Sequence, residues 1–346
     1  MKFQKVITFD DVLLQPQYSE IESRSTISTG TTIRDLSFGI PVISSPMDTI
    51  TERQMIYALD KLGGLGIVHR YNTIPEQAKI VHSAHADGAQ NIGAAIGVSG
   101  DYLERSKAVV MAGANVLCVD IAHGHHALMK NALKCLRSLF DESVYIVAGN
   151  VATLEGFNDL ADWGADAIRV GIGGGSICST RIQTGHGVPT LQSVIDCAKS
   201  DRNATLIADG GIKTSGDIAK AIAAGADFVM LGSMLSGADE TPGDVLTVPE
   251  IVGGKQVYSN YKTYRGMASV EAQIDWRGHT ASVEGVTSTV PCKGPVHIIV
   301  ESIMNGLKSG MSYSGAASIT SFQSKSRFIE QTSSGKIESS THINLL

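Results

Sequence analysis

The sequence predicts an α/β protein built as a (β/α)₈ (TIM) barrel, and three observations support this fold class. From Pro41 onward, a short aliphatic strand, a loop and an alanine-rich helical pattern follow one another repeatedly. The strands are nearly continuous runs of Val, Ile, Leu and Ala, as is typical of parallel strands covered on both faces. The unit recurs about eight times, which favours a closed barrel over an open, doubly wound sheet.

The barrel elements can be placed along the chain in order. We expect the strands at Pro41–Ser44, Gly66–His69, Asn91–Ile96, Val116–Asp120, Val144–Ala148, Ala167–Val170, Leu206–Asp209 and Phe228–Leu231. Helical patterns lie between them at Gln54–Lys61, Tyr102–Ala112, Leu128–Leu139, Leu154–Trp163, Leu191–Ala198 and Ile218–Ala224. Most of these helices stop near Gly or Gly-Ala, a common signal for the C-terminal end of a helix.

Other segments flank the barrel. Residues 1–40, which contain TFDDVLLQP, are expected to form an N-terminal extension that packs on the main domain. Residues 238–295 show little periodicity, and so long an insertion in a compact domain is usually functional, so we expect a mobile flap. A helical pattern at Val296–Leu307 closes the fold, and the Ser-rich tail 318–346 is expected to add little to the core. We therefore predict one catalytic barrel domain over residues 1–346.

Composition narrows the class of protein. The 346 residues are 43% hydrophobic but only 5% aromatic, so the core must be aliphatic. A net charge of −6 without a basic run argues against a nucleic-acid partner. No stretch reaches the length of a membrane span and no leader opens the chain, so we expect no membrane partner. The five cysteines are scattered without a CxxC pair, which favours free thiols in a reducing cytoplasm over disulfides or a metal site.

The strongest functional signal is the stretch Ala167–Gly187, which reads AIRVGIGGGSICSTRIQTGHG. Glycines at 171, 173, 174 and 175 allow positive φ and close approach to a ligand. Consecutive N–H groups in such a loop can bind a phosphate, and Ser176 adds a hydroxyl donor. Cys178 follows, and Thr180 is placed to hydrogen-bond near its thiol. A glycine loop or a cysteine alone is weak evidence, but together they predict an active site.

Polar residues recur where a barrel places its chemistry, at the C-terminal ends of the strands. These residues are Ser44, Ser45, Met47, Asp48, His69, Arg70, Asp120, His123, Asn150, Cys178, Asp209, Gly210, Gly211, Gly232 and Ser233. The Asp-Gly-Gly and Gly-Ser turns after the last two strands match the common phosphate site of such barrels. Any one of these residues could be a helix cap, but the whole set predicts a phosphate-binding pocket with a reactive thiol.

With these motifs located, the sequence resembles the inosine monophosphate (IMP) dehydrogenase and guanosine monophosphate (GMP) reductase superfamily over nearly its whole length. The matching text is FDDVLL (9–14), SSPMDT (44–49), GGLGIVHR (63–70), DIAHGH (120–125), AGNVAT (148–153), VGIGGGSICSTR (170–181), IADGGIKTSGDIAKA (207–221), VMLGSML (229–235) and YRGM (264–267). The cysteine loop and the Asp-Gly-Gly segment are the most specific of these motifs.

The resemblance implies roles for individual residues. Cys178 is expected to attack C2 of the purine nucleotide, with Thr180 and Glu284 as its catalytic partners. The substrate-binding set it implies is Ser45, Met47, Asn150, Arg169, Gly175, Ser176, Asp209, Gly210, Gly211, Met230, Gly232, Ser233, Tyr264, Gly266 and Met267. Asp120, Ala122 and His123 are expected to contact the nicotinamide cofactor. The dehydrogenase branch often binds a monovalent cation on the cysteine loop, so Gly173, Gly175 and Cys178 form a candidate potassium site.

The two branches differ in what enters or leaves at C2. Dehydrogenases normally carry a pair of regulatory CBS domains after the second barrel unit, and here Arg70 runs directly on to the third strand. They also use an Arg-Tyr pair on a long flap to activate water, whereas Met267–Lys293 contains only Arg277 and no such pair. Reductases pair the Thr after the cysteine loop with a flap Glu, and Glu284 lines up with it. The motif SYSGA (312–316) also resembles reductase sequences, whereas FDDVLL, DIAHGH, TYRGM and SPMDT resemble dehydrogenase sequences.

The flap decides the chemistry, so the prediction is an NADPH-dependent GMP reductase that forms IMP and ammonia through a covalent Cys178 adduct. The alternative is an IMP dehydrogenase without CBS domains that uses NAD. A second alternative, an inert nucleotide-binding barrel, does not need a reactive thiol, and an aldolase-type barrel lacks its lysine on a strand end. The resemblance also implies a homotetramer or octamer.

Overall fold

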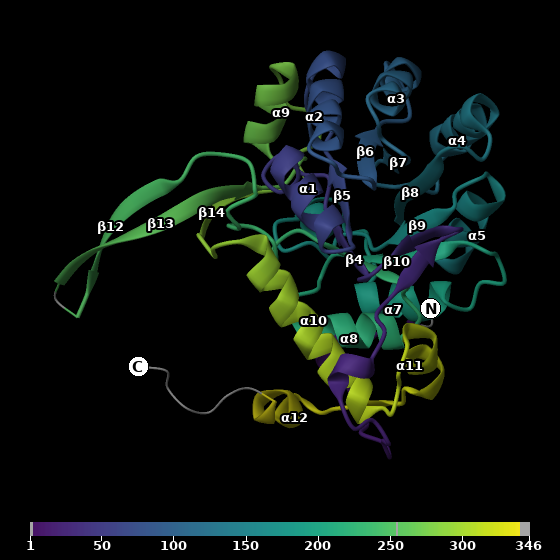
Figure 1. Cartoon of the computed structure of the whole chain (residues 1–346), viewed down its shortest axis with the longest axis vertical. Helices are drawn as coiled ribbons and strands as arrows, with labels where there is room; N and C mark the ends of the chain where they lie inside the picture. Colours follow the sequence, from purple (N-terminus) through teal and green to yellow (C-terminus); the bar gives the residue numbers. More distant parts are fainter. Residues whose placement is uncertain (1–2, 254, 340–346) are drawn as a thin grey trace.

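The computed structural model describes residues 3–253 and 255–339, which are built around a closed barrel of eight parallel strands (Figure 1). The strands are β4 (Val42–Ser44), β5 (Leu65–Val68), β6 (Ile92–Ile96), β7 (Val116–Asp120), β8 (Tyr145–Val151), β9 (Ala167–Val170), β10 (Thr205–Asp209) and β11 (Phe228–Leu231). Each strand pairs with the next along the chain, and β11 closes on β4 with Val229 opposite Val42. All the predicted strands are confirmed, and β8 runs on beyond its predicted end to Val151.

Helices cover the outside of the barrel (Figure 1). They are α1 (Arg53–Lys61), α2 (Ile74–Ala86), α3 (Tyr102–Met111), α4 (Ala127–Phe140), α5 (Leu154–Asp162), α7 (Thr190–Cys197) and α8 (Ser215–Ala223). The predicted helices all form, but α2 was not predicted, although Thr73 and Glu76 make a capping box at its start. A second capping box of Thr214 and Asp217 starts α8 before the predicted Ile218.

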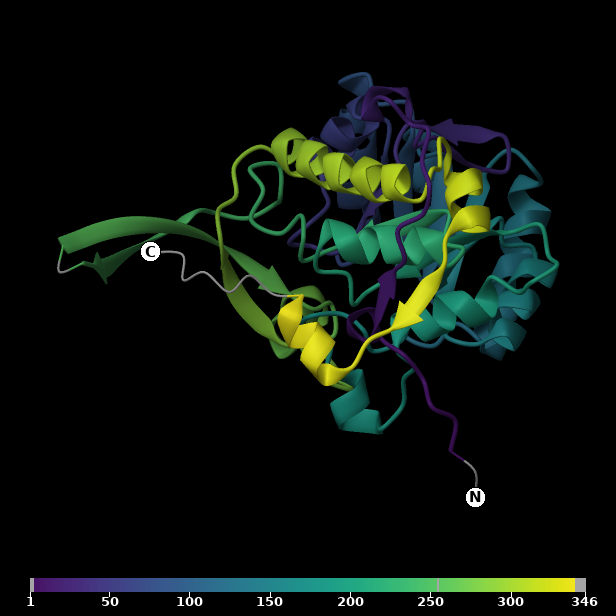
Figure 2. The same cartoon turned by 90° about the horizontal axis from the view of Figure 1, so that it is seen from below.

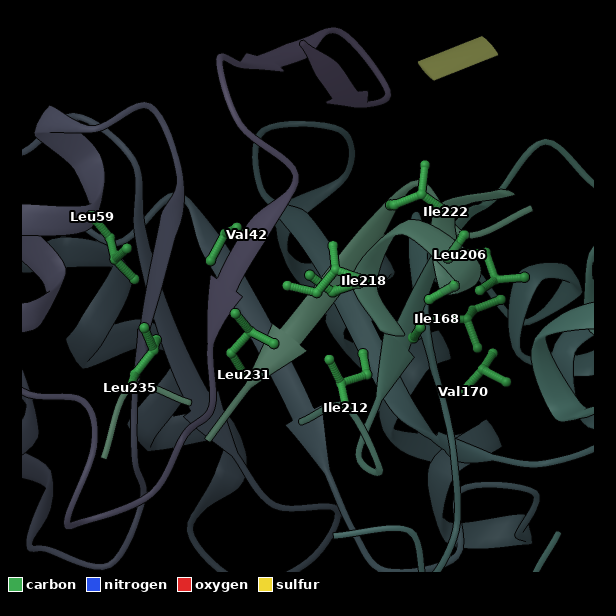
Figure 3. Close-up of a cluster of buried hydrophobic side chains, with 14 of the residues drawn as sticks. Val42, Leu59, Ile168, Val170, Leu206, Ile212, Ile218, Ile222, Leu231 and Leu235 are labelled. Carbon is green, nitrogen blue, oxygen red and sulfur yellow. The ribbon is translucent and has the colours of Figure 1, made fainter. Parts of the chain in front are cut away.

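The core has two layers. One lies between strands and helices, where aliphatic side chains such as Ile168, Leu231 and Ile218 interdigitate (Figure 3). The other fills the barrel and includes Ile43, Ile67 and other strand residues, all buried. Alternate residues of each strand therefore face opposite layers, which explains the near-continuous apolar runs in the sequence.

The N-terminal extension packs on the barrel as predicted. It contains η1 (Phe9–Asp11), β1 (Val12–Leu14), η2 (Arg24–Thr26) and a hairpin of β2 (Thr31–Ile33) and β3 (Leu36–Phe38). Ile33 and Phe38 of the hairpin join the apolar cluster inside the barrel. The Phe38 ring contacts Phe228 edge-on, with centroids 5.2 Å apart. The hairpin thus covers the interior of the barrel from one end.

The expectation that the tail adds little to the core is wrong for its described part. After α10 (Val296–Tyr313), the chain forms α11 (Ile319–Lys325), β15 (Phe328–Glu330) and α12 (Ser333–Glu338). Phe322 is fully buried in the core, and β15 pairs with β1 of the N-terminal extension (Figure 2). Serine-rich composition concealed one apolar face of α11, because its buried positions are only Ile319 and Phe322. Residues 340–346 of the predicted tail lie outside the described residues.

Truncating Phe322 should therefore destabilise the whole barrel. We expect Phe322→Ala to lower the free energy of unfolding by about 3–5 kcal/mol, since it leaves a cavity in a packed core. The same truncation at Ile298, which is 54% exposed on α10, should cost less than about 1 kcal/mol. Urea unfolding of both variants measures the difference. Equal, small effects would mean that the tail is not part of the core.

The segment after β11 is more regular than its sequence indicates. It contains β12 (Leu246–Val252), β13 (Lys255–Arg265), α9 (Val270–Arg277) and β14 (Thr287–Pro291). Both views show the β12–β13 ribbon projecting from the barrel (Figures 1 and 2). The strands β12, β13 and β14 pair antiparallel, so β14 returns the chain to the barrel at the base of the ribbon.

Within residues 3–253 and 255–339, no helix combines the length and the apolar character that crossing a bilayer requires.

Candidate active site

A cavity of about 470 Å³ lies at the C-terminal ends of the barrel strands. Its wall contains all three predicted catalytic residues, Cys178, Thr180 and Glu284. It also contains every residue of the predicted substrate-binding set, together with Asp120 and Ala122 of the predicted cofactor set. Residues from seven barrel strand ends and the flap therefore meet at one site, as a barrel fold requires.

The glycine loop after β9 contains four glycines, two of which have positive φ. Gly171 has φ +145°, and a Cβ there would lie 2.0 Å from the carbonyl oxygen of Asp209, so a side chain is excluded. Gly173 also has positive φ, at +76°. Gly174 and Gly175 lie outside the positive-φ region, so two of the four glycines use the conformation that the sequence allows. The loop then enters the short helix α6 (Thr180–Thr184).

Three side chains form a continuous hydrogen-bonded chain at the centre of the cavity wall. The Cys178 thiol donates to Thr180 Oγ1 at 3.2 Å, and the Thr180 hydroxyl donates to Glu284 Oε2 at 2.7 Å. The other carboxylate oxygen of Glu284 accepts a hydrogen bond from the Ser282 hydroxyl at 2.9 Å. The arrangement can move a proton between a carboxylate and a group held beside the thiol.

Backbone pairing fixes the flap carboxylate in this position. The amide of Ser179 donates to the carbonyl of Glu284 at 2.9 Å, and the amide of Val286 donates to the carbonyl of Ile177 at 3.0 Å. Cys178 and Gly285 form an antiparallel bridge between these two bonds. The nucleophile loop and the flap thus act as one short sheet, although more than a hundred residues separate them.

The predicted phosphate-binding residues also come together. Tyr264 is nine-tenths buried or more, and its hydroxyl lies 3.4 Å from the Ser176 hydroxyl. Burial raises the pKa of Tyr264, so the phenol stays a neutral donor. A Cβ at Gly232 would lie 3.1 Å from that hydroxyl and 3.3 Å from the sulfur of Met47. The turn at Gly210 approaches the loop closely enough that its Cβ would lie 3.1 Å from the amide nitrogen of Gly175.

A buried arginine joins two carboxylates of the cavity. Arg169 donates to Asp209 Oδ2 at 2.9 Å and to Asp120 Oδ1 at 2.5 Å. Asn150 donates to the same Asp209 oxygen at 2.8 Å. Burial alone would lower the pKa of Arg169, but Asp209, Cys118 and Asp120 raise it above its ordinary value, so the guanidinium stays charged. It holds both carboxylates in fixed orientations.

A model of the IMP dehydrogenase / GMP reductase domain matches residues 6–342. The chain belongs to the IMP dehydrogenase / GMP reductase family. Proteins of this family are oxidoreductases that act on purine nucleotides, and the fold, the family and this general activity predicted from the sequence are confirmed.

Relatives from both branches resemble the chain. It is 34% identical to an inosine-5′-monophosphate dehydrogenase from Nitrosopumilus maritimus, over 100% of both chains. It is 33% identical to a GMP reductase from Leishmania major, over 97% of this chain and 96% of the relative. A crystal structure of a cysteine-to-alanine variant of Trypanosoma brucei GMP reductase, in complex with guanosine 5′-monophosphate, superposes with a TM-score of 0.92 at 32% identity and covers 99% of both chains.

Sequence reasoning gave no role to one side of the family's cavity. Arg70, Tyr71, Gln273 and Arg277 line it. Arg70 was predicted only as one of the residues at the strand ends, and none of the four was given a role in the predicted reductase reaction. The position of Arg70 after the second strand was the available signal. The contact of its loop with α9 was not readable, because the two segments lie about two hundred residues apart in the chain.

The structure brings the candidate potassium residues to the cavity, but it does not bring His123 of the predicted cofactor set there. His123 is exposed and does not line the cavity, so the structure does not bring it to the other predicted residues. Burial and the neighbouring His125 lower its pKa. The candidate potassium residues Gly173, Gly175 and Cys178 do lie on one loop beside the cavity. There the carbonyl of Gly175 already accepts a hydrogen bond from the Cys178 amide at 3.1 Å.

All five thiols are free, and their surroundings predict different reactivities. Burial raises the pKa of Cys118 to about 11 and that of Cys197 to about 12, so neither should form a thiolate at pH 8. Cys178, Cys135 and Cys292 are accessible. Iodoacetamide at pH 8, followed by mass spectrometry, should label only these three. An added purine nucleotide should protect Cys178 alone, and labelling of Cys118 or Cys197 in the folded protein would contradict the assignment.

Proposed function

We propose that this protein is a GMP reductase, which converts GMP and a reduced nicotinamide dinucleotide, NADPH, into IMP and ammonia. The observation that carries the proposal is the hydrogen-bonded chain from Cys178 through Thr180 to Glu284. A leaving amine needs a proton, and this chain can supply one next to the nucleophile. The flap between Met267 and Lys293 contains no Arg-Tyr pair that could activate water instead.

The proposed chemistry begins with Cys178. Its thiolate bonds to C2 of the purine, and the carbon becomes tetrahedral. The Glu284–Thr180 pair then gives a proton to the exocyclic nitrogen, and ammonia leaves with its bonding electrons. The product of this half is a covalent adduct in which C2 is again double-bonded to a ring nitrogen.

The second half replaces the sulfur by hydrogen. When bound, a reduced nicotinamide supplies the hydride that adds to C2. The C2–sulfur bond then breaks, its electron pair returns to Cys178, and IMP is released. Per turnover, GMP and the reduced dinucleotide with one proton give IMP, the oxidised dinucleotide and ammonia.

The nucleotide is held by the residues predicted for it. The phosphate fits the loop at Gly175 and Ser176, the turn at Gly211 and the Ser233 hydroxyl. Asp209, oriented by Arg169 and Asn150, is placed to accept hydrogen bonds from the ribose hydroxyls. Met267 and Tyr264 line the same cavity and would close over the bound nucleotide.

The cofactor and the assembly belong to the proposal as well. The buried Nε of Arg70, 3.8 Å from Asp120, has no hydrogen-bond partner, which supports an acceptor group of the cofactor at this wall of the cavity. A potassium ion bound by the carbonyls of the cysteine loop is also part of the proposal. Assays of the activity with and without a potassium salt test it. Ile251 and Tyr258 are exposed on the projecting ribbon, because the ribbon by itself cannot bury them. Their exposure supports the proposed homotetramer or octamer.

The dehydrogenase reaction is the second candidate, and overall similarity does not separate the two. The two relatives quoted above, one from each branch, differ in identity by a single percentage point, 34% against 33%. Their alignments run over 484 and 482 positions against 346 residues here, so relatives of both kinds contain residues without a counterpart in this chain. The absence of a CBS-domain insertion after Arg70 therefore does not favour the reductase over the dehydrogenase. The choice between the two reactions rests on the flap residues.

A paired spectrophotometric assay tests the proposal. One cuvette contains GMP and NADPH, and the other IMP, NAD and potassium. Oxidation of NADPH with release of ammonia in the first supports the reductase. Reduction of NAD in the second would establish the dehydrogenase, with Arg277 the first residue to examine for water activation. No reaction in either would indicate an inert nucleotide-binding protein.

A further inference from the structure

A lysine outside the cavity holds the Gly-Ser turn (residues 232–234) that follows β11. Lys293 comes shortly after β14, and its ammonium donates to the carbonyl oxygen of Ser233 at 2.9 Å and to that of Met234 at 3.2 Å. Ser233 lines the cavity, whereas Lys293 does not. The ammonium therefore contacts the turn proposed for the phosphate without reaching the ligand site itself.

The close approach of Lys293 to this turn depends on the backbone around it. Gly237 has φ +79°, and a Cβ there would lie 2.2 Å from the carbonyl oxygen of Pro291, so a side chain is excluded. The Lys293 amide donates to the carbonyl of Gly237 at 2.8 Å, and the Asp239 amide donates to the carbonyl of Gly294 at 3.0 Å. These contacts fix the segment that contains the lysine against the segment that follows the Gly-Ser turn.

The positive charge of Lys293 is not neutralised by a carboxylate. Among residues 3–253 and 255–339, no acidic side chain forms an ion pair with its ammonium, and its third N–H has no protein acceptor. Loss of water around the ammonium lowers the pKa of Lys293, and no acidic neighbour offsets this effect. A bound anion close to the ammonium would stabilise its charged form.

The residues proposed to hold the phosphate have no positive charge of their own. They provide only amides and hydroxyls, and they are Gly175, Ser176, Gly211 and Ser233. In the described part of the chain no lysine lines the cavity, and its arginines contact carboxylates or aromatic rings. Holding a phosphate dianion away from water with neutral donors alone is costly, so a positive charge behind these donors would stabilise it.

We propose that Lys293 is a positioning residue for the 5′-phosphate of the nucleotide, because it fixes the Gly-Ser turn and places a positive charge behind it. In a trans peptide the N–H points opposite to the C=O. An ammonium that holds the carbonyl of Ser233 therefore turns the amide of Met234, on the same peptide plane, away from itself. The inference rests on the nucleotide pocket of the proposed function. It does not depend on the direction of the reaction, since IMP is the product of the reductase and the substrate of the dehydrogenase.

Binding of IMP and inosine, which differ only in the 5′-phosphate, tests this role without turnover. Lys293→Met should weaken IMP binding about tenfold or more and change inosine binding less than about twofold, because a charge and its hydrogen bonds to the turn are lost. Lys293→Arg keeps the charge and should restore part of the IMP affinity. Lys107→Met changes an exposed lysine of α3 and should leave both affinities unchanged. Calorimetry measures these dissociation constants.

The comparison of the two ligands distinguishes positioning of the phosphate from a general structural role. Lys293 is exposed and not part of the buried core, so the methionine variant should fold, and circular dichroism checks this. Loss of IMP and inosine affinity by the same factor would show that Lys293 only maintains the shape of the cavity and would overturn the inference.

The outcomes also separate this inference from the proposed function. IMP binding to Lys293→Met within about twofold of the parent, with GMP-dependent oxidation of NADPH by the parent, would refute the role of Lys293 and leave the reductase standing. A loss specific to IMP, with no oxidation of NADPH by the parent, would refute the reductase and support the role of Lys293. A parent that binds IMP no more tightly than inosine would refute the phosphate pocket and the inference with it.

Discussion

Cys178→Ala should abolish turnover and leave GMP binding nearly intact. The alanine cannot form the bond to C2, and we expect the rate with GMP and NADPH to fall by at least about a thousandfold. The phosphate and ribose contacts come from other residues, so the dissociation constant of GMP should change by less than about threefold. Steady-state assays and calorimetry measure the two quantities. The T. brucei GMP reductase whose structure resembles this one formed its complex with guanosine 5′-monophosphate as a cysteine-to-alanine variant.

The matched control is Cys135→Ala, which removes an exposed thiol from α4. It should keep full activity. Retained turnover in Cys178→Ala would mean that no covalent adduct is needed. A simultaneous loss of GMP binding would mean that the thiol shapes the cavity and would leave its role as nucleophile without support.

The barrel could be predicted because its signal is local and repeated. Each strand is a run of aliphatic residues followed by a helix, and most of these helices end near a glycine, so the features lie within a few residues of one another. The position of Cys178 was predictable for the same reason, since β9, the glycine loop and the thiol are contiguous. Long-range packing left no such signal. The burial of Phe322 and the stacking of Tyr71 on Trp276 depend on segments that meet only in the folded chain.

In the candidate site, too, local features could be predicted from the sequence and long-range contacts could not. The Thr180–Glu284 contact was expected from the resemblance to a family, and no spacing rule could have given it, because 104 positions separate the two residues. The antiparallel bridge between Cys178 and Gly285 supplies the physical cause, since it aligns the flap with the nucleophile loop. In the sequence, Arg277 is the lone arginine of the flap, and it was a candidate only for water activation in the dehydrogenase alternative. Its place in the cavity follows from the packing of α9 against the loop of Tyr71.

Glu284→Gln should slow the release of ammonia and spare the transfer of hydride. The amide keeps the size of the carboxylate but cannot carry a proton to the leaving amine. We expect this step to slow by about 10²- to 10⁴-fold, the usual contribution of a positioned acid or base. A rapid-quench measurement of ammonia in a single turnover with GMP and NADPH gives the rate of this step.

The hydride step can be measured alone in the reverse direction. IMP and NADP⁺ without ammonia should form the Cys178 adduct and NADPH, and Glu284→Gln should do so within about threefold of the parent. Glu271→Gln is the control, because Glu271 is a second flap carboxylate that accepts from a threonine hydroxyl, that of Thr287 at 2.6 Å, without a connection to the thiol. If both steps slow together, Glu284 holds the loop and is not the proton donor. If neither slows, the chain from Cys178 to Glu284 is structural, and the case for the reductase over the dehydrogenase loses its main support.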